Sequence, residues 1–200
     1  MGKILKSTWA LFTGIGIILL ANGLQGNLMG VRSVIENFSS LSTGIMMSGY
    51  FIGYFVGSNL TPNMVSRVGH IRVFAAFAST ASLSILIIAT YVNPIVWTLG
   101  RFLTGLSLVS CYIVAESWLN DRANNRTRGK LLSVYMIINY FGLACGALLL
   151  NFDDPTSFKP FILVSILLSI ALVPILLTKR PAPKFKKIGT LSLVELYKIS

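Results

Sequence analysis

Histidine, cysteine and acidic residues are scarce in this sequence. It has one histidine, His70, in a predicted loop, two cysteines, Cys111 and Cys145, and six aspartates and glutamates. The cysteines form no Cys-x-x-Cys pair and have no neighbouring histidine, which excludes a disulfide scaffold and a zinc ribbon. The sequence motifs of hydrolases, zinc proteases and phosphate-binding loops are also missing. The sequence therefore predicts two free, buried thiols in a protein that is not an enzyme and that holds no metal or cofactor.

Charge is sparse along the chain, and hydrophobic residues dominate it. Only 12% of the 200 residues are charged, whereas 54% are hydrophobic, and the mean hydropathy is +0.75. These values exclude a soluble globular domain. The net charge of +11 does not indicate nucleic-acid binding, because the basic residues lie between apolar segments and are not interleaved with exposed aromatic residues.

Six apolar segments have the length that a bilayer-spanning helix needs, which is roughly 20 residues. They cover about residues 8–30, 42–66, 71–92, 94–118, 131–150 and 158–178. None alternates with the period of two that a barrel strand requires. The first segment is too long for a signal peptide and has no cleavage site, so that it stays as the first span. The predicted fold class is an all-α membrane protein whose six-helix transmembrane domain covers residues 1–178.

The basic residues are distributed unevenly between the two sides of these spans. Arg32 and Lys159 fall on one side, and fourteen lysines and arginines fall on the other: Lys3, Lys6, Arg67, Arg72, Arg122, Arg126, Arg128, Lys130, Lys179, Arg180, Lys184, Lys186, Lys187 and Lys198. Such a bias predicts that both termini are cytoplasmic. Residues 179–200 read as a basic cytoplasmic linker. Since they end without a cap or a polar tail, we expect a longer chain with a second half.

The second predicted helix carries a stripe of glycines on one face. Gly49, Gly53 and Gly57 recur every four residues, and small residues at this spacing let another helix approach closely in a membrane. The stripe therefore predicts a helix–helix interface, which is either a static contact or a surface along which helices slide.

Arg101 is a cation inside the fourth predicted span. A charge there costs at least about 2 kcal/mol unless it faces protein or water. Arg101 therefore contacts an anionic substrate or a coupling ion, or it reaches the outer headgroups as a snorkelling side chain. Asn22 and Gln25 lie at the same depth in the first helix, and Asn139 lies in a polar stripe of the fifth. These amides either form interhelical hydrogen bonds or belong to a solute site.

Glu116 lies near the inner end of the fourth predicted helix. At 1.5 Å per residue it is about 22 Å from Arg101, so that the two side chains cannot pair. We expect it to form an ion pair with cytoplasmic arginines at the inner mouth; proton or substrate handling is the alternative. At the outer end, Arg32 and Glu36 have the spacing of an exposed ion pair.

Two motifs resemble those of the major facilitator superfamily. Residues 62–74, PNMVSRVGHIRVF, resemble the Gly-x-x-x-Asp-Arg-x-Gly-Arg-Arg loop between its second and third helices. Arg67 and Gly69 match, and Arg72 is a basic residue one position late. The departures are Pro62 for the first glycine, Ser66 for the aspartate, and His70 and Ile71 for the two arginines.

The second motif lies in the fourth helix. RFLTGLS, residues 101–107, resembles the family's Arg-x-x-Gln-Gly pattern with Thr104 in place of glutamine, and residues 115–142 resemble a bacterial branch. The resemblance implies the N-terminal half of a secondary transporter in the bacterial inner membrane. It implies alternating access, and two groups of three helices fit an inverted 3+3 repeat.

These expectations define two groups of functional residues. Arg101, Asn22, Gln25 and Asn139 would contact a small solute or a coupling proton or ion, and Arg67, Gly69, Arg72 and Glu116 would form the inner gate. The other expected partners are the lipid bilayer and the missing C-terminal half. Two alternatives stay open: a six-helix half that self-associates into a transporter or channel, and a structural or sensor protein that transports nothing.

Overall fold

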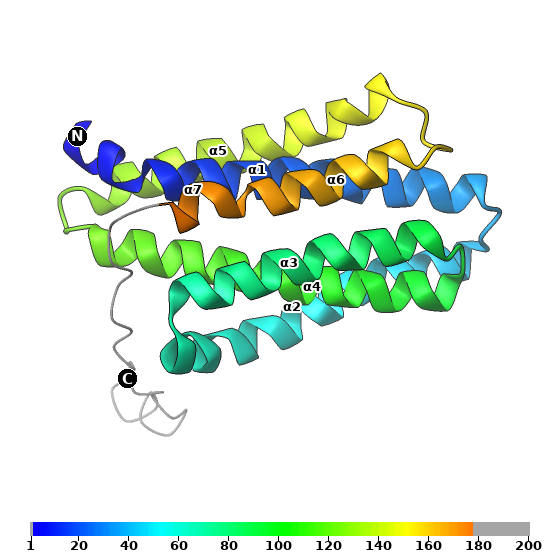
Figure 1. Cartoon of the computed structure of the whole chain (residues 1–200), viewed down its shortest axis with the longest axis horizontal. Helices are drawn as coiled ribbons and strands as arrows, with labels where there is room; N and C mark the ends of the chain where they lie inside the picture. The colour runs from blue at the N-terminus through cyan, green and yellow to red at the C-terminus, as the bar shows by residue number, and fades with distance from the viewer. Residues whose placement is uncertain (1, 178–200) are drawn as a thin grey trace, which may run out of the picture.

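The computed structural model describes residues 2–177, with side chains from residue 8 onward, and all of its regular structure is helical (Figure 1). The predicted linker at residues 179–200 lies outside the described residues. The helices are α1 (Gly2–Ile35), α2 (Ser40–Val68), α3 (His70–Thr90), α4 (Pro94–Arg122), α5 (Arg128–Leu149), the short 3-10 helix η1 (Leu150–Phe152), α6 (Lys159–Ile170) and α7 (Leu172–Leu176).

Five of these helical segments are long and apolar enough to cross a membrane. They are residues 8–35 of α1, α3, α4, α5 with η1, and α6 continued by α7. The 29 residues of α2 are long enough but are not among these segments, and serine, threonine and glycine residues interrupt the apolar residues of α2 in its first half as well as in its second. The span at residues 42–66 therefore stays a prediction based on its length and its place in the bundle.

The junction between α2 and α3 differs from the expected loop. Helix α2 continues through Pro62 to Val68, and α3 begins at His70, so that Gly69 is the one residue between them. Its φ of +89° is a conformation that glycine adopts without a steric penalty. His70 is accordingly buried rather than in a loop, with its Nε2 3.0 Å from the Ser117 hydroxyl of α4.

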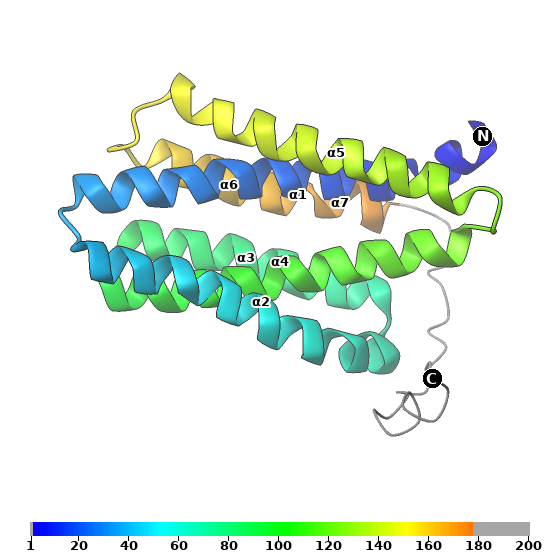
Figure 2. The same cartoon turned by 180° about the vertical axis from the view of Figure 1, so that it is seen from behind.

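The helices pack in two groups that meet along α3 and α6. Helix α1 packs against α5 and α6, and α4 packs against α2 and α3. Figure 2 shows α5 beside α1 and α2 beside α4. The N-terminus, the junction of α2 with α3 and the loop at residues 123–127 lie at one end of the bundle, and the loops at residues 36–39, 91–93 and 153–158 lie at the other (Figure 1). The connections therefore alternate between the two ends.

The helix pairs α2–α4 and α1–α5 make equivalent close backbone contacts. A Cβ on Gly53 would collide with the Phe102 carbonyl oxygen, and one on Gly105 with that of Tyr50. On the other side of the bundle, a Cβ on residue 146 would collide with the carbonyl oxygen of residue 20, and one on residue 23 with that of residue 143. Residues 20 and 23 thus correspond to 102 and 105, each 82 positions later. Residues 50 and 53 correspond to 143 and 146, each 93 positions later. In this correspondence α1 matches α4 and α2 matches α5, as they would in a 3+3 repeat.

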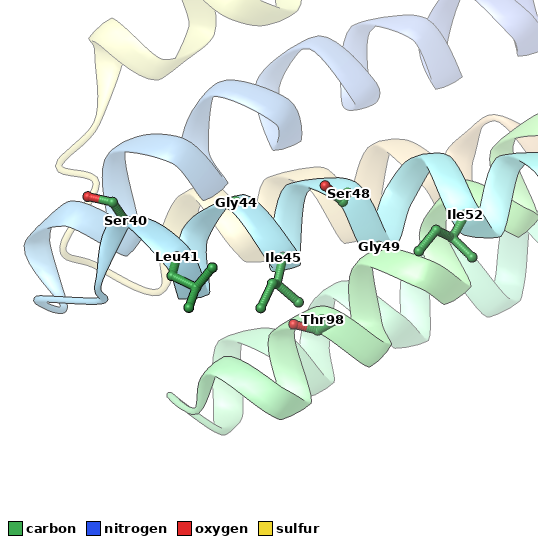
Figure 3. Close-up of a pocket in the computed structure, with 8 residues that line it drawn as sticks. All are labelled: Ser40, Leu41, Gly44, Ile45, Ser48, Gly49, Ile52 and Thr98. Carbon is green, nitrogen blue, oxygen red and sulfur yellow. The ribbon is translucent and has the colours of Figure 1, made fainter.

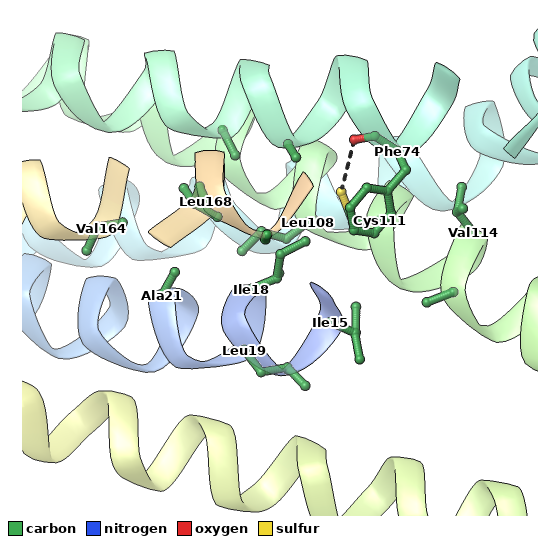
Figure 4. Close-up of a cluster of buried hydrophobic side chains, with 14 of the residues drawn as sticks. Ile15, Ile18, Leu19, Ala21, Phe74, Leu108, Cys111, Val114, Val164 and Leu168 are labelled. Carbon is green, nitrogen blue, oxygen red and sulfur yellow. Dashed lines mark hydrogen bonds between the residues drawn. The ribbon is translucent and has the colours of Figure 1, made fainter. Parts of the chain in front are cut away.

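The core lies where α1, α3, α4 and α6 meet. Ile15 and Ile18 of α1, Phe74 of α3, Leu108 of α4 and Leu168 of α6 are fully buried there (Figure 4). Lipid tails are as apolar as these side chains, so that close packing rather than exclusion of water holds them together. Both cysteines are free. Cys111 is buried beside the Phe74 carbonyl oxygen, whereas Cys145 is only half-buried, contrary to expectation.

Candidate functional site

Arg101 is buried between α4 and α2. Its side chain is only 5% exposed, and its Cζ lies 4.6 Å from the centre of the Tyr50 ring. A guanidinium over an aromatic face is attracted by the negative charge of the ring's π face. This contact depends on the glycine register, because Gly105, one turn after Arg101, lets the backbone at Tyr50 come close to α4. Arg101 therefore faces protein and not lipid.

The guanidinium lacks hydrogen-bond partners for part of its N–H groups. Its Nε and Nη1 atoms are buried without a partner. In the described part of the chain, ion pairs join Arg32 to Glu36 and Lys159 to Asp153, and no carboxylate pairs with Arg101. A buried charge without a counterion is strongly unfavourable. The site around Arg101 is thus electrostatically incomplete.

The two amides of α1 hydrogen-bond to α4 beside Arg101. Gln25 Nε2 donates to the Thr104 hydroxyl at 3.3 Å, and Asn22 Nδ2 donates to the Tyr112 hydroxyl at 3.2 Å. Thr104 lies one turn after Arg101, so that the structure brings α1 and α4 together at the depth expected for this group. Gln25 Oε1 is buried and has no hydrogen-bond partner. The amides therefore act as interhelical contacts and still leave one free acceptor.

Asn139 lies away from this group. It is half-buried on α5 beside Tyr135, one turn earlier on the same helix. Tyr135 in turn donates a hydrogen bond of 3.0 Å to Glu116 Oε1 on α4. The structure thus connects Asn139 with Glu116 through Tyr135 and does not bring it to Arg101.

The predicted gate residues gather at one end of the bundle. Arg67 and Arg72 are exposed on either side of Gly69, and Glu116 is exposed near the end of α4. The described hydrogen bond of Glu116 comes from Tyr135, and among the described residues no arginine forms an ion pair with it. In this part of the chain Glu116 therefore makes a tyrosine contact between α4 and α5 in place of the expected arginine pair.

The opposite end is held by ionic and capping contacts. The predicted pair of Arg32 and Glu36 is present at 2.6 Å, and Arg32 also donates to the Pro155 carbonyl oxygen at 2.9 Å. These contacts tie α1 to the loop before α6. In that loop, hydrogen bonds from the Thr156 hydroxyl and backbone N–H lower the pKa of Asp154.

A cavity of about 480 Å³ lies along the N-terminal halves of α2 and α4 (Figure 3). It is lined by Ser40, Leu41, Gly44, Ile45, Ser48, Gly49, Ile52 and Thr98. None of the residues predicted to contact solute lines it, and its walls are mainly apolar. This cavity is therefore distinct from the polar group at Arg101.

Sequence reasoning missed Tyr50 and the role of Thr104. Tyr50 and Tyr54 lie one turn apart on α2, with ring centres 6.3 Å apart. The spacing of four residues, which places Tyr50 and Tyr54 on one face of a helix, was the feature of the sequence that could have identified them. Thr104 was identified only as a departure from a motif, although it joins Gln25 to the turn that carries Arg101.

The fold and the site define a helical integral membrane protein with a buried, unpaired cation between its helices. The sequence profile of the Major Facilitator Superfamily matches residues 9–198. The chain belongs to this family.

Curated relatives carry the same family designation. The chain is 25% identical over 189 residues to the uncharacterized MFS-type transporter YcaD of Escherichia fergusonii, covering 94% of this chain and 50% of that protein. It is 30% identical over 156 residues to YcaD of Escherichia coli O45:K1, covering 76% and 40%. An uncharacterized MFS-type transporter of an Enterobacter species is 27% identical over 171 residues, covering 84% and 44%. The chain thus spans about half the length of these relatives.

Proposed function

We propose that this chain is the N-terminal half of a secondary transporter that moves a small solute across the bacterial inner membrane by alternating access. Membership of the superfamily and the names of the bacterial relatives support transport in general. The observation that carries the assignment of the site is Arg101, which is buried among helices with unpaired N–H groups. An intramembrane charge of this kind is expected at a substrate or ion pathway.

In this proposal Arg101, Asn22 and Gln25 contact the solute or a coupling proton or ion. Asn22 and Tyr50 are only half-buried, so that they form the accessible edge of the group. Asn139 joins the site from α5 when the helices rearrange. The hydrogen bonds of Asn22 and Gln25 to α4 would break and reform as solute enters, because they are long enough, at 3.2 and 3.3 Å, to be exchanged at low cost.

The inner gate in this proposal is built from Glu116, Arg67, Gly69 and Arg72. Glu116 and Tyr135 join α4 to α5 at the end of the bundle where the described basic residues concentrate. Six of these residues, Arg67, Arg72, Arg122, Arg126, Arg128 and Lys130, lie at that end, against Arg32 and Lys159 at the other. We infer that the more basic end, which includes the N-terminus, is cytoplasmic.

The second half of the transporter would cover the open faces of α2 and α5. Large apolar side chains are exposed on both helices, among them Phe51, Phe55, Ile137 and Phe141. Only 22% of the most apolar stretch of α5 is buried, against 61% for α1 and α4. These faces would otherwise contact lipid, or a second copy of this chain if the half self-associates.

The experiment that tests this function is solute uptake by the protein in its full natural length, reconstituted in liposomes. Wild-type protein takes up at least one solute of a metabolite mixture. Arg101→Ala lowers its uptake at least tenfold. Arg101→Lys lowers it less, because the charge is kept, but still lowers it, because the planar guanidinium is lost. The matched control is Arg126→Gln, in the exposed α4–α5 loop, which leaves uptake unchanged.

Two results would contradict this account. Normal uptake by both Arg101 variants would show that the site is assigned wrongly. No uptake of any solute by wild-type protein would leave a structural or sensor protein as the better interpretation.

A further inference from the structure

The charge around Arg101 determines which ligands this site can hold. We propose that the site binds a small water-soluble anion, with a carboxylate or a similar oxyanion against the guanidinium; this inference rests on the proposed transport function. A buried guanidinium with two unpartnered nitrogen atoms, Nε and Nη1, favours a ligand that supplies negative charge and hydrogen-bond acceptors together. A neutral solute supplies the acceptors but leaves the charge uncompensated.

No acidic side chain of the described residues takes this place. Glu116 accepts from Tyr135 near the far end of α4, and Asp121 lies beyond it. The other described acidic residues, Glu36, Asp153 and Asp154, lie at the outer end of the bundle, and two of them already pair with Arg32 or Lys159. Among the described residues the counterion of Arg101 is therefore missing, and we assign this place to a ligand.

The neighbours of Arg101 fit an anion better than a cation. The face of Tyr50 lies under the guanidinium and adds no formal charge. Asn22 lies near the Tyr50 and Tyr112 hydroxyls, so that an amide N–H and two phenol hydroxyls are close to the accessible edge. These groups donate hydrogen bonds to an oxyanion. A cationic solute would face an uncompensated positive charge in a medium of low dielectric constant.

Matched pairs of charged and neutral compounds test this inference on the purified full-length protein. The probes are benzoate and benzamide, lactate and lactamide, succinate and succinamide, and inorganic phosphate. One readout is the melting temperature in detergent. The other is the rate at which phenylglyoxal modifies Arg101, followed by mass spectrometry of the peptide that contains it. The second readout needs no variant that could fail to fold.

We expect at least one anion to raise the melting temperature and to slow the modification of Arg101 several-fold, whereas its neutral amide does neither. Arg101→Gln weakens binding of that anion at least tenfold, which corresponds to about 1.4 kcal/mol. Arg126→Gln leaves binding unchanged, because that side chain is exposed in the α4–α5 loop.

Three results would overturn the inference. The first is equal binding of an anion and its amide, and the second is undiminished anion binding by Arg101→Gln. The third is no protection of Arg101 by any anion, which would show that its counterion comes from another part of the full-length protein. Uptake of a neutral solute that depends on Arg101 would keep the transport proposal and remove this one. Anion binding without any uptake would keep the anion site and remove the transport proposal.

Discussion

At the scale of single residues, the position of Arg101 depends on α2 as much as on its own helix. The centre of the Tyr50 ring lies 4.6 Å from the Arg101 Cζ, so that the ring packs against the guanidinium. Such a contact contributes about 0.5–2 kcal/mol, depending on how far it is removed from water. Because the guanidinium has few hydrogen bonds, the ring is one of its main sources of stabilisation.

Replacing Tyr50 tests this contact. Tyr50→Leu should lower the free energy of unfolding by about 1–2 kcal/mol, because the cation–π contact and ring packing are lost. Tyr50→Phe keeps the ring and should have a smaller effect. Thermal unfolding in detergent measures both, with Tyr91→Leu, an exposed tyrosine in the loop between α3 and α4, as the control. Equal destabilisation by the Phe and Leu variants would show that the hydroxyl, and not the ring, matters.

The sequence identified Arg101, Asn22 and Gln25 because polar side chains are conspicuous inside apolar helices. Tyr50 and Thr104 were not identified from the sequence, since both residue types are common in membrane helices without a functional role. Their importance arises from the register between α2 and α4 and between α1 and α4. A helical period says which residues share a face, but it does not set how two helices align.

At the scale of helices, glycines determine how closely the pairs approach. A Cβ on Gly53 would meet the backbone of Phe102 and Leu106, and one on residue 146 would meet the backbone of residues 20 and 24. Backbone atoms cannot move aside as a flexible side chain can, so that any larger residue separates the helices. These contacts pack α2 closely against α4 and α1 closely against α5.

Alanine at these positions tests the packing. Gly53→Ala and Gly146→Ala should each destabilise the protein by about 1–3 kcal/mol, the usual cost of overpacking. Gly44→Ala is the matched control, since its Cβ would meet nothing within 4 Å and alanine favours a helix. Thermal unfolding in detergent compares the three. If Gly53→Ala is tolerated as well as Gly44→Ala, the close approach does not hold the helices together.

The glycine stripe on α2 is visible in the sequence because its spacing is regular. The equivalent contacts of α1 and α5 are less visible, because Gly23 and Gly146 lie in helices without a long stripe. The junction between α2 and α3 differs from what its residue types predict. Proline, glycine and arginine together resemble a loop, yet Pro62 is accommodated inside α2 and a single glycine reverses the chain.

At the scale of the whole molecule, two three-helix groups place Arg101 and Asn22 where α1, α2 and α4 come together. From the sequence, the six apolar segments and the distribution of basic residues predicted the helices and their alternating direction, and the polar residues predicted that α1 and α4 meet at the depth of Arg101. The chain spans about half the length of its relatives, and in the proposed transporter a second set of helices would complete a cavity at this site. Alternating access requires that this cavity opens to each side in turn.

Labelling of a cysteine at position 22 from each side of the membrane tests this claim most directly. The background is the full-length protein with Cys111→Ala and Cys145→Ser. The test variant adds Asn22→Cys to this background. Two marker variants add Arg126→Cys or Thr156→Cys instead, one for each side of the membrane. A membrane-impermeant thiol reagent should reach position 126 from the cytoplasm, position 156 from outside, and position 22 from both. Transported solute should raise labelling from one side and lower it from the other. Labelling of position 22 from a single side under all conditions, or a parallel change on both sides, would contradict alternating access.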